Sequence, residues 1–347
     1  MTRTAVLVGA ATVLSLAIVP ADAPSFEVDP FWPKPLPNHW ILGSVTGVAV
    51  DAQDHIWLVH RGMDSLTART EAGLATDPPT AESCCAPAPP VLEFDQAGNL
   101  VGHWGGPGAG FDWPKTPAGI DVDRGGHVWI AGDTHVLKFT RTGAFVTQVA
   151  APDRVAVFNA VAGVFKPERL PAVSCVRAAK DGKVYVCDRK NNRIQVFQKD
   201  STFLQEAFVS KMTLGEGSVW DIAFSPDAQQ RFMYVADGAD QTVWVLRRDT
   251  LEVISHVGSG GRYPGHFYGV GSVAIDSHGN LYTGETYEGK RLQKFVYKGV
   301  GPKPVAGPVR EQPHAVPRHV RLSRLWLGRA ARGGPVPGRP RPAGDDR

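Results

Sequence analysis

The chain has 347 residues, 43% of them hydrophobic, which is enough to bury a sizeable core. Its 38 glycines and 28 prolines fit a turn-rich all-β protein, and no stretch of the body shows sustained helical periodicity. The net charge of +3 is no argument for nucleic-acid binding, because residues 302–347 alone carry +7 and leave about −4 for the rest.

The N-terminus has the features of an export signal. Arg3 precedes an apolar run, residues 5–19, that is short for a membrane span, and residues 20–23 offer small side chains for cleavage. We therefore predict a signal peptide over residues 1–23 and a secreted or periplasmic protein, with a membrane anchor as the alternative. An oxidising compartment would allow the four cysteines to form two disulfides.

One phrase recurs five times along the body. Each copy is an apolar strand, a polar turn and a second strand that ends in an acidic residue or arginine, and a third strand follows. The alternation has period two, as half-buried strands require, and Gly-Asn, Asp-Gly and Gly-Gly occupy the turns. The clearest copies cover residues 47–61, 119–133, 175–189, 221–238 and 272–285.

Repeats of this size stack to bury a common core, and four short strands per repeat arranged radially make a β-propeller. We predict an all-β propeller over residues 24–301 with five visible blades, since near-equal repeats argue against a β-sandwich. Residues 26–37 would supply a strand that closes the ring, residues 62–89 form an insertion, and residues 151–169 read as a connector. The predicted first strands start at Thr46, Ala118, Ser174, Trp220 and Gly271.

Residues 302–347 form a separate segment with nine prolines, many arginines and no strand pattern. Such a composition predicts a disordered basic tail. The alternative is a shifted reading frame, because GC-rich DNA read out of frame yields text rich in arginine, proline, glycine and alanine.

The propeller geometry predicts where a site would lie. The first strand of each blade lines the axis and the second runs back, so the start of one and the end of the other meet at the same mouth. There we expect Arg61 and Arg189 to bind a carboxylate, or to tie neighbouring blades together. His60, Trp220 and Tyr268 are the other candidate ligand-binding residues, with structural roles as the alternative.

Acidic residues end four of the second strands. Asp133, Asp188, Asp237 and Glu285 could form a metal-binding ring, but we expect them to cap the next turn by accepting backbone N–H bonds. No phosphate-binding loop, Ser-His-Asp motif or zinc-finger spacing is present.

Two of the cysteines are predicted to pair through strand register. If residues 180–182 form a three-residue turn, Cys175 falls directly opposite Cys187, close enough for a disulfide. Cys84 and Cys85 would remain as a vicinal pair, either bonded or reduced.

Several phrases resemble NHL-repeat propellers and, more closely, bacterial relatives of the peptidyl-α-hydroxyglycine α-amidating lyases. The phrases that carry the resemblance lie in residues 47–62, 84–108, 184–197, 217–238 and 289–299, in the family's order. The family fold has six blades, so this chain would lack one or hold it incomplete. The resemblance assigns Arg61 and Arg189 to the family's catalytic machinery.

The same resemblance implies zinc held by three histidines, and calcium is a second metal of such propellers. The matching positions here are Ala118, Ser174 and Gly271, so those ligands are missing, and the family's catalytic tyrosine would fall in a blade absent between about residues 150 and 170. We therefore expect no confident cofactor and a degenerate relative that binds a small anionic or peptide ligand. The alternative is an active lyase that yields a peptide amide and glyoxylate.

Overall fold

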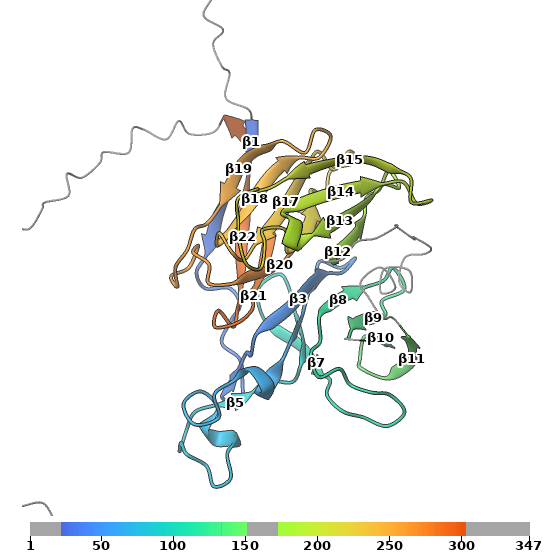
Figure 1. Cartoon of the computed structure of the whole chain (residues 1–347). Helices are drawn as coiled ribbons and strands as arrows, with labels where there is room; N and C mark the ends of the chain where they lie inside the picture. The colour runs from blue at the N-terminus through green and yellow to red at the C-terminus, as the bar shows by residue number, and fades with distance from the viewer. Residues whose placement is uncertain (1–21, 133, 151–172, 303–347) are drawn as a thin grey trace, which may run out of the picture. The chain divides into compact units, whose positions relative to one another are not determined.

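A computed structural model describes residues 22–132, 134–150 and 173–302, and these residues form an all-β protein (Figure 1). Five four-stranded antiparallel sheets are the blades of a propeller, as predicted from the repeats. No helix in the described part of the chain is long and apolar enough to cross a bilayer. The predicted signal peptide up to residue 21, the tail beyond residue 302 and the predicted connector at 151–169 lie outside the described residues.

The innermost strand of each blade begins within one residue of the predicted position. The innermost strands are β3 (Val45–Val50), β8 (Gly119–Val122), β12 (Val173–Ala178), β16 (Asp221–Phe224) and β20 (Val270–Ile275). The second strands are β4 (Ile56–His60), β9 (Val128–Ala131), β13 (Val184–Asp188), β17 (Phe232–Asp237) and β21 (Leu281–Glu285).

The outer halves of the blades complete the sheets. The third strands are β6 (Val91–Phe94), β10 (His135–Phe139), β14 (Arg193–Phe197), β18 (Thr242–Arg247) and β22 (Arg291–Pro302). The outermost strands are β7 (Leu100–Trp104), β11 (Phe145–Ala150), β15 (Phe203–Phe208), β19 (Val253–Val257) and, in the fifth blade, β1 (Asp22–Asp29).

The N-terminal strand joins the two ends of the described chain. β1 pairs antiparallel with β22, so that Asp22 lies opposite Pro302 and Asp29 opposite Lys294. The fifth blade is thus built from both ends, and the prediction that an N-terminal strand closes the ring is confirmed. Because the strand starts at Asp22, it includes the last two residues of the predicted signal peptide.

The predicted insertion between β4 and β6 contains no blade strand. It holds two short 3₁₀ helices, η1 (Gly62–Ser65) and η2 (Gly73–Ala75), and β5 (Ala86–Pro87), which pairs in parallel with β2 (Trp40–Ile41). A third 3₁₀ turn, η3 (Arg189–Asn191), follows β13.

The core lies between the blades rather than in one centre. Separate apolar clusters join blades 1 and 2, 3 and 4, 4 and 5, and 5 and 1, each built from the faces of two neighbouring sheets. Alternating side chains supply these faces; in β8 and β9, for example, Ile120 and Ile130 pack against blade 1. Burial of these faces is the main driving force for stacking the repeats.

Candidate functional site at the mouth of the central cavity

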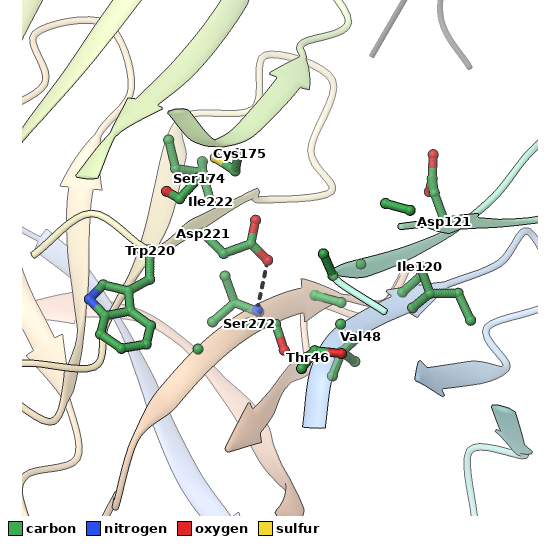
Figure 2. Close-up of a pocket in the computed structure, with 18 of the residues that line it drawn as sticks. Thr46, Val48, Ile120, Asp121, Ser174, Cys175, Trp220, Asp221, Ile222 and Ser272 are labelled. Atoms are coloured by element: carbon green, nitrogen blue, oxygen red, sulfur yellow. Dashed lines mark hydrogen bonds between the residues drawn. The ribbon is translucent and has the colours of Figure 1, made fainter. Parts of the chain in front are cut away.

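A cavity of about 640 Å³ lies where the innermost strands of the five blades converge (Figure 2). Its size falls in the range of roughly 300–1,000 Å³ that is typical of small-ligand pockets. The cavity also reaches between blades 2 and 3, because Trp129 and Val136 line it from one blade and Val176 from the other.

Three of the predicted site residues line this cavity together. Arg61 follows β4, Arg189 follows β13, and Trp220 precedes β16, so residues far apart in the sequence meet at one mouth. The convergence follows from the repeat geometry, in which the ends of second strands and the starts of first strands share one face of the ring.

Arg189 already has protein partners. Its guanidinium carbon lies 3.4 Å from the centre of the Trp220 ring, its Nη2 pairs with Glu216 Oε2 at 2.9 Å, and its Nε donates to the Glu216 carbonyl oxygen at 2.7 Å. Gly217 holds this loop in place, because its φ of +77° favours glycine and a Cβ there would overlap the Arg189 carbonyl oxygen. Arg189 is therefore tied to blade 4.

Arg61 differs, because its side chain has no hydrogen bond or ion pair with any residue that the structure describes. Its backbone N–H donates to the Ser44 carbonyl oxygen at 3.0 Å, while its Nε is buried without a hydrogen-bond partner. A buried donor left unpaired costs about 1–3 kcal/mol, and more when it is charged. A ligand acceptor in the cavity would recover that free energy.

His60, a candidate ligand-binding residue, is not among the described residues that line the cavity. Its ring is fully buried, its Nδ1 accepts the backbone N–H groups of Gly43 and Gly62 at 3.0 Å, and its Nε2 donates to the Pro89 carbonyl oxygen at 2.9 Å. Burial lowers the pKa of His60 to about 4, with the bond to Pro89 opposing this only in part. His60 is therefore a neutral structural residue that holds the insertion beside Arg61.

Tyr268, another candidate ligand-binding residue, packs against a protein side chain. It is half-exposed, it lies outside the set of described residues that line the cavity, and the Arg262 guanidinium stacks on its ring at 4.1 Å. The aromatic group at the mouth is instead Tyr287, whose ring meets Trp220 edge-on at 5.9 Å. Sequence reasoning missed Tyr287 because it lies in the turn after β21, where no alternation marks its direction.

The described acids at the ends of second strands all have protein partners, and Asp237 caps the next turn as predicted. Asp237 accepts the backbone N–H groups of Ala239 and Asp240 and the indole N–H of Trp244, although burial raises its pKa to about 6. Asp188 and Glu285 are likewise buried and bonded within their own blades, Asp188 to Arg193 at 2.7 Å. Asp188 makes no capping bond to the turn that follows it, so the capping prediction holds for Asp237 alone among the described acids. All three side chains have protein partners, which argues against a metal-binding ring. Asp133 lies outside the described residues.

A second group of cavity residues has no counterpart in the sequence predictions. Asp121, Arg177 and Asp221 belong to the innermost strands of blades 2, 3 and 4, and all three line the cavity below the mouth. Their signal in the sequence is a charge inside an otherwise apolar first strand, as in GIDV, CVRAA and WDIAF. Such interruptions indicate side chains that face a polar space rather than a core.

The three positions that the family resemblance assigns to zinc ligands do line the cavity. They present the methyl group of Ala118, the hydroxyl of Ser174, which donates to the Val219 carbonyl oxygen at 2.9 Å, and no side chain at Gly271. Zinc sites in proteins use imidazole, thiolate or carboxylate donors. These residues therefore do not fit the family's metal.

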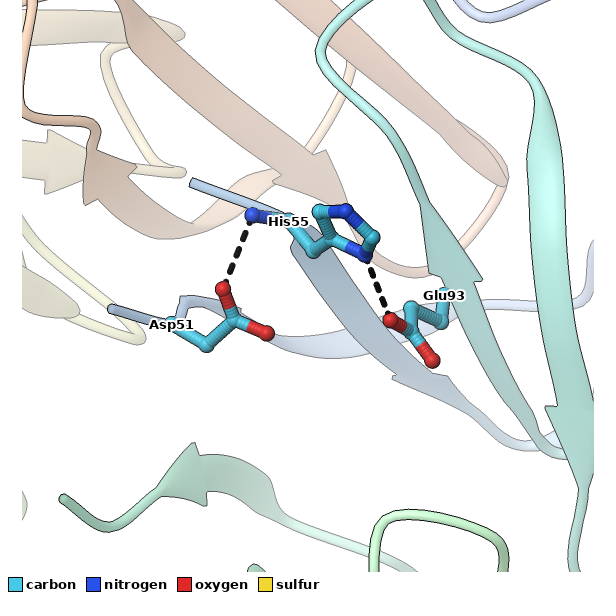
Figure 3. A group of neighbouring side chains, drawn as sticks. All are labelled: Asp51, His55 and Glu93. Atoms are coloured by element: carbon cyan, nitrogen blue, oxygen red, sulfur yellow. Dashed lines mark hydrogen bonds and ion pairs between the residues drawn. The ribbon is translucent and has the colours of Figure 1, made fainter. Parts of the chain in front are cut away.

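A different cluster has the composition of a metal site, at the turn end of blade 1 (Figure 3). Asp51, His55 and Glu93 lie within 4.8 Å of one another. Arg141 Nη2 lies 2.7 Å from Asp51 Oδ2 and also pairs with Glu93 Oε1, so both carboxylates already share a protein cation. Burial alone would raise the pKa of Asp51, but hydrogen bonds from Trp57 and backbone N–H groups, with Arg141, lower it. The cluster is a blade-to-blade ion pair.

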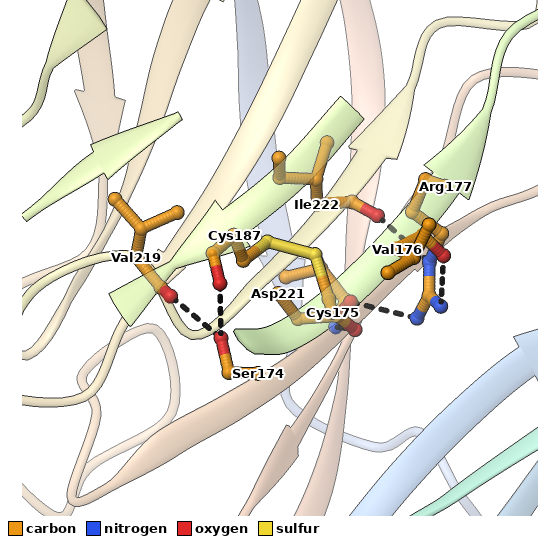
Figure 4. Close-up of a disulfide and its surroundings, with 9 residues drawn as sticks. Ser174, Cys175, Val176, Arg177, Cys187, Val219, Asp221 and Ile222 are labelled. Carbon is orange, nitrogen blue, oxygen red and sulfur yellow. Dashed lines mark hydrogen bonds and ion pairs between the residues drawn. A yellow bond between two sulfur atoms is a disulfide. The ribbon is translucent and has the colours of Figure 1, made fainter. Parts of the chain in front are cut away.

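Both cysteine pairs are bonded. Cys175 lies directly opposite Cys187 on β12 and β13, as the predicted turn requires, and the two form a disulfide beside the cavity wall (Figure 4). Cys84 and Cys85 form a vicinal disulfide in the insertion. This outcome resolves the alternative left open by the sequence.

One segment of the chain matches a family model. Residues 173–197, which hold β12, β13 and β14, match the NHL repeat. No curated protein matches the chain.

Several solved structures are similar. A protein of unknown function from Bacteroides caccae is 14% identical over 69% of each chain, with a TM-score of 0.33. A catalytically inactive variant of virginiamycin B lyase from Staphylococcus aureus, with quinupristin, is 11% identical over 81% of this chain and 76% of that one, with a TM-score of 0.29. At these identities and TM-scores, the similar structures support no conclusion about activity. The chain is a five-bladed β-propeller that contains an NHL repeat.

Proposed function

We propose that the protein binds a small ligand bearing a carboxylate at the mouth of the central cavity, with Arg61 as the anion-binding residue. The observation that carries this proposal is the Arg61 side chain, which lines the cavity, has no partner among the described residues and keeps its Nε buried and unpaired. Guanidinium groups bind carboxylates through two parallel hydrogen bonds, which suits an acceptor entering from the cavity.

An aromatic pair that lines the same cavity as Arg61 gives the ligand a second feature. Trp220 is nearly buried and Tyr287 is half-exposed, and both line the cavity next to the stacked Arg189. A carboxylate attached to an apolar or planar group would bind Arg61 at one end and pack on these rings at the other.

Hippurate has both features and is a suitable probe, with its uncharged amide as the matched control. We expect calorimetry to show hippurate binding to the full chain, and hippuramide binding at least tenfold more weakly, because the amide lacks the charge that Arg61 pairs with. Arg61→Ala should lose hippurate binding. Arg124→Ala, which removes the same charge from an exposed turn outside the cavity lining, should not. Equal binding of hippurate to wild type and Arg61→Ala would contradict the proposal.

The resemblance to amidating lyases supports the same anion-binding role, because Arg61 and Arg189 match two arginines of that family. It does not support turnover, since Ala118, Ser174 and Gly271 offer no donor set for the family's zinc. We expect no glyoxylate release from a peptidyl-α-hydroxyglycine, with or without added zinc. Zinc-dependent release would show that the protein is a lyase rather than a binding protein.

We further infer that the protein is exported. The apolar N-terminal run and the two disulfides support this inference. Alkylation of the denatured, unreduced protein, followed by mass spectrometry, should label none of the four cysteines. Labelling of all four in protein taken from its native compartment would contradict it.

A further inference from the structure

The central cavity contains a second charged region below its mouth, and its charges are not balanced. Asp121 on β8, Arg177 on β12 and Asp221 on β16 all line it, two carboxylates against one guanidinium. Figure 2 labels the two carboxylates. What this region can bind depends on which carboxylate the arginine neutralises.

Arg177 is committed to Asp221. Its Nη2 lies 2.7 Å from Asp221 Oδ1, and its Nε donates to the Ile222 carbonyl oxygen at 3.2 Å (Figure 4). Asp221 Oδ2 accepts the backbone N–H of Val273 at 3.2 Å, which fixes the carboxylate between blades 4 and 5. The pair is therefore a neutral link across three blades.

Asp121 is the carboxylate that remains. No side chain among the described residues donates a hydrogen bond to it, and its accessible surface faces the cavity, which protein atoms enclose. Burial raises the pKa of Asp121; the charge of Arg177 lowers it in part, and Asp123 and Asp221 raise it further. Lys138, on the same blade, pairs with Asp123 at 3.4 Å, so the cation whose charge reaches Asp121 is Arg177, which is itself paired with Asp221.

An aromatic ring lies beside this carboxylate. Asp121 is directly opposite Trp129 in the β8–β9 register, so the two side chains share one face of blade 2, and both line the cavity. The Trp129 ring already accepts a cation, because Lys138 Nζ lies 4.6 Å from its centre. A carboxylate next to an indole is a suitable environment for an ammonium group.

We propose that Asp121 and Trp129 form an ammonium subsite, so that the ligand of the cavity is a short peptide with free termini. This proposal rests on the carboxylate site at Arg61. Asp121 lies three residues further along its strand than the mouth residue Ala118, which corresponds to about 10 Å along the axis. A chain of roughly three extended residues spans that distance, so the C-terminal carboxylate would reach Arg61 while the N-terminal ammonium reaches Asp121.

The test compares trialanine, N-acetyltrialanine and trialanine amide by calorimetry on the full chain. Wild type should bind trialanine about tenfold more tightly than its acetylated form, because only the free amine pairs with Asp121. Asp121→Asn should abolish that difference. Asp112→Asn, an exposed residue outside the lining of this cavity, should preserve it. Lowering the pH should weaken the binding of trialanine more than that of N-acetyltrialanine, because Asp121 takes up a proton.

The outcomes separate this inference from the proposed function. If both trialanine and its acetylated form bind equally well through Arg61, the carboxylate site holds and the ammonium subsite is wrong. If trialanine amide binds as tightly as trialanine, the Arg61 site is wrong. Calcium or magnesium that binds in an Asp121-dependent manner and displaces trialanine would show that a metal, not an amine, occupies the subsite.

Discussion

Two blades place an arginine at the same repeat position at the cavity mouth, but the two arginines have different surroundings. Arg61 and Arg189 each follow the second strand of a blade and line one cavity. Blade 4 brings Trp220 and Glu216 against Arg189, whereas the corresponding stretch of blade 2, residues 116–118, brings no acid and no aromatic ring against Arg61. The next blade thus decides whether a repeat arginine is structural or free to bind a ligand.

The residues that precede the two arginines differ as well. His60 is kept neutral by burial and makes three hydrogen bonds with the surrounding loops, while Asp188 is paired with Arg193 inside its own blade. The end of the second strand is therefore stabilised by an uncharged imidazole in blade 1 and by an internal ion pair in blade 3.

The largest expected effect is a loss of stability in acid, caused by protonation of His60. Its folded pKa of about 4 lies below the unfolded value of 6.5, so the folded state binds fewer protons in this range. The free energy of unfolding should be fully retained above pH 6.5 and should fall by about 3 kcal/mol as the pH drops through 4. Chemical denaturation at a series of pH values across this range measures the loss.

His60→Asn supplies the control for that prediction. The amide oxygen can accept the N–H groups of Gly43 and Gly62, and it cannot be protonated in this range. The variant should be less stable than wild type at neutral pH but should depend less on pH. An equally steep loss in both proteins would mean that another group controls acid unfolding.

The second prediction compares the alanine variants of the two arginines. Arg189→Ala should lower the free energy of unfolding by about 1–2 kcal/mol, because it removes a cation–π contact and an ion pair, and should change hippurate affinity less than about twofold. Arg61→Ala should leave the free energy of unfolding nearly unchanged and should lose hippurate binding. Urea denaturation and calorimetry on both variants make the comparison, and a loss of affinity in Arg189→Ala equal to that in Arg61→Ala would contradict it.

The smallest expected effect comes from releasing Arg189. Glu216→Gln removes the charge that pairs with its Nη2 and should raise hippurate affinity by about two- to fivefold, because a second guanidinium becomes available. Stability should change by less than about 1 kcal/mol, since the pair is partly exposed. Glu206→Gln breaks a similar ion pair on the outer strands of blade 3 and should leave affinity unchanged. Equal gains in both variants would indicate a general effect of net charge.

Much of the fold could be predicted because the repeats carry it. The alternation and turns gave the innermost strands to within one residue, and the register of one turn gave the Cys175–Cys187 pair. The same geometry brought Arg61, Arg189 and Trp220 to one mouth.

The rest depends on contacts that repeat geometry does not determine. His60 is buried because residues 43, 62 and 89 come from loops around the insertion, and Glu216 reaches Arg189 through a loop whose shape relies on Gly217. Asp121 was missed for a different reason. The charge inside its otherwise apolar strand indicates polar surroundings, but only the structure shows that it faces the cavity.

The central claim is that Arg61, and not Arg189, is the cation that receives the ligand. Proton–nitrogen NMR of the arginine Nε–H groups tests it directly, with the Arg61 and Arg189 signals assigned from their loss in Arg61→Lys and Arg189→Lys. Hippurate should shift the Arg61 signal downfield and leave that of Arg189 nearly unchanged. A shift confined to Arg189, with Arg61 unaffected at saturating hippurate, would contradict it.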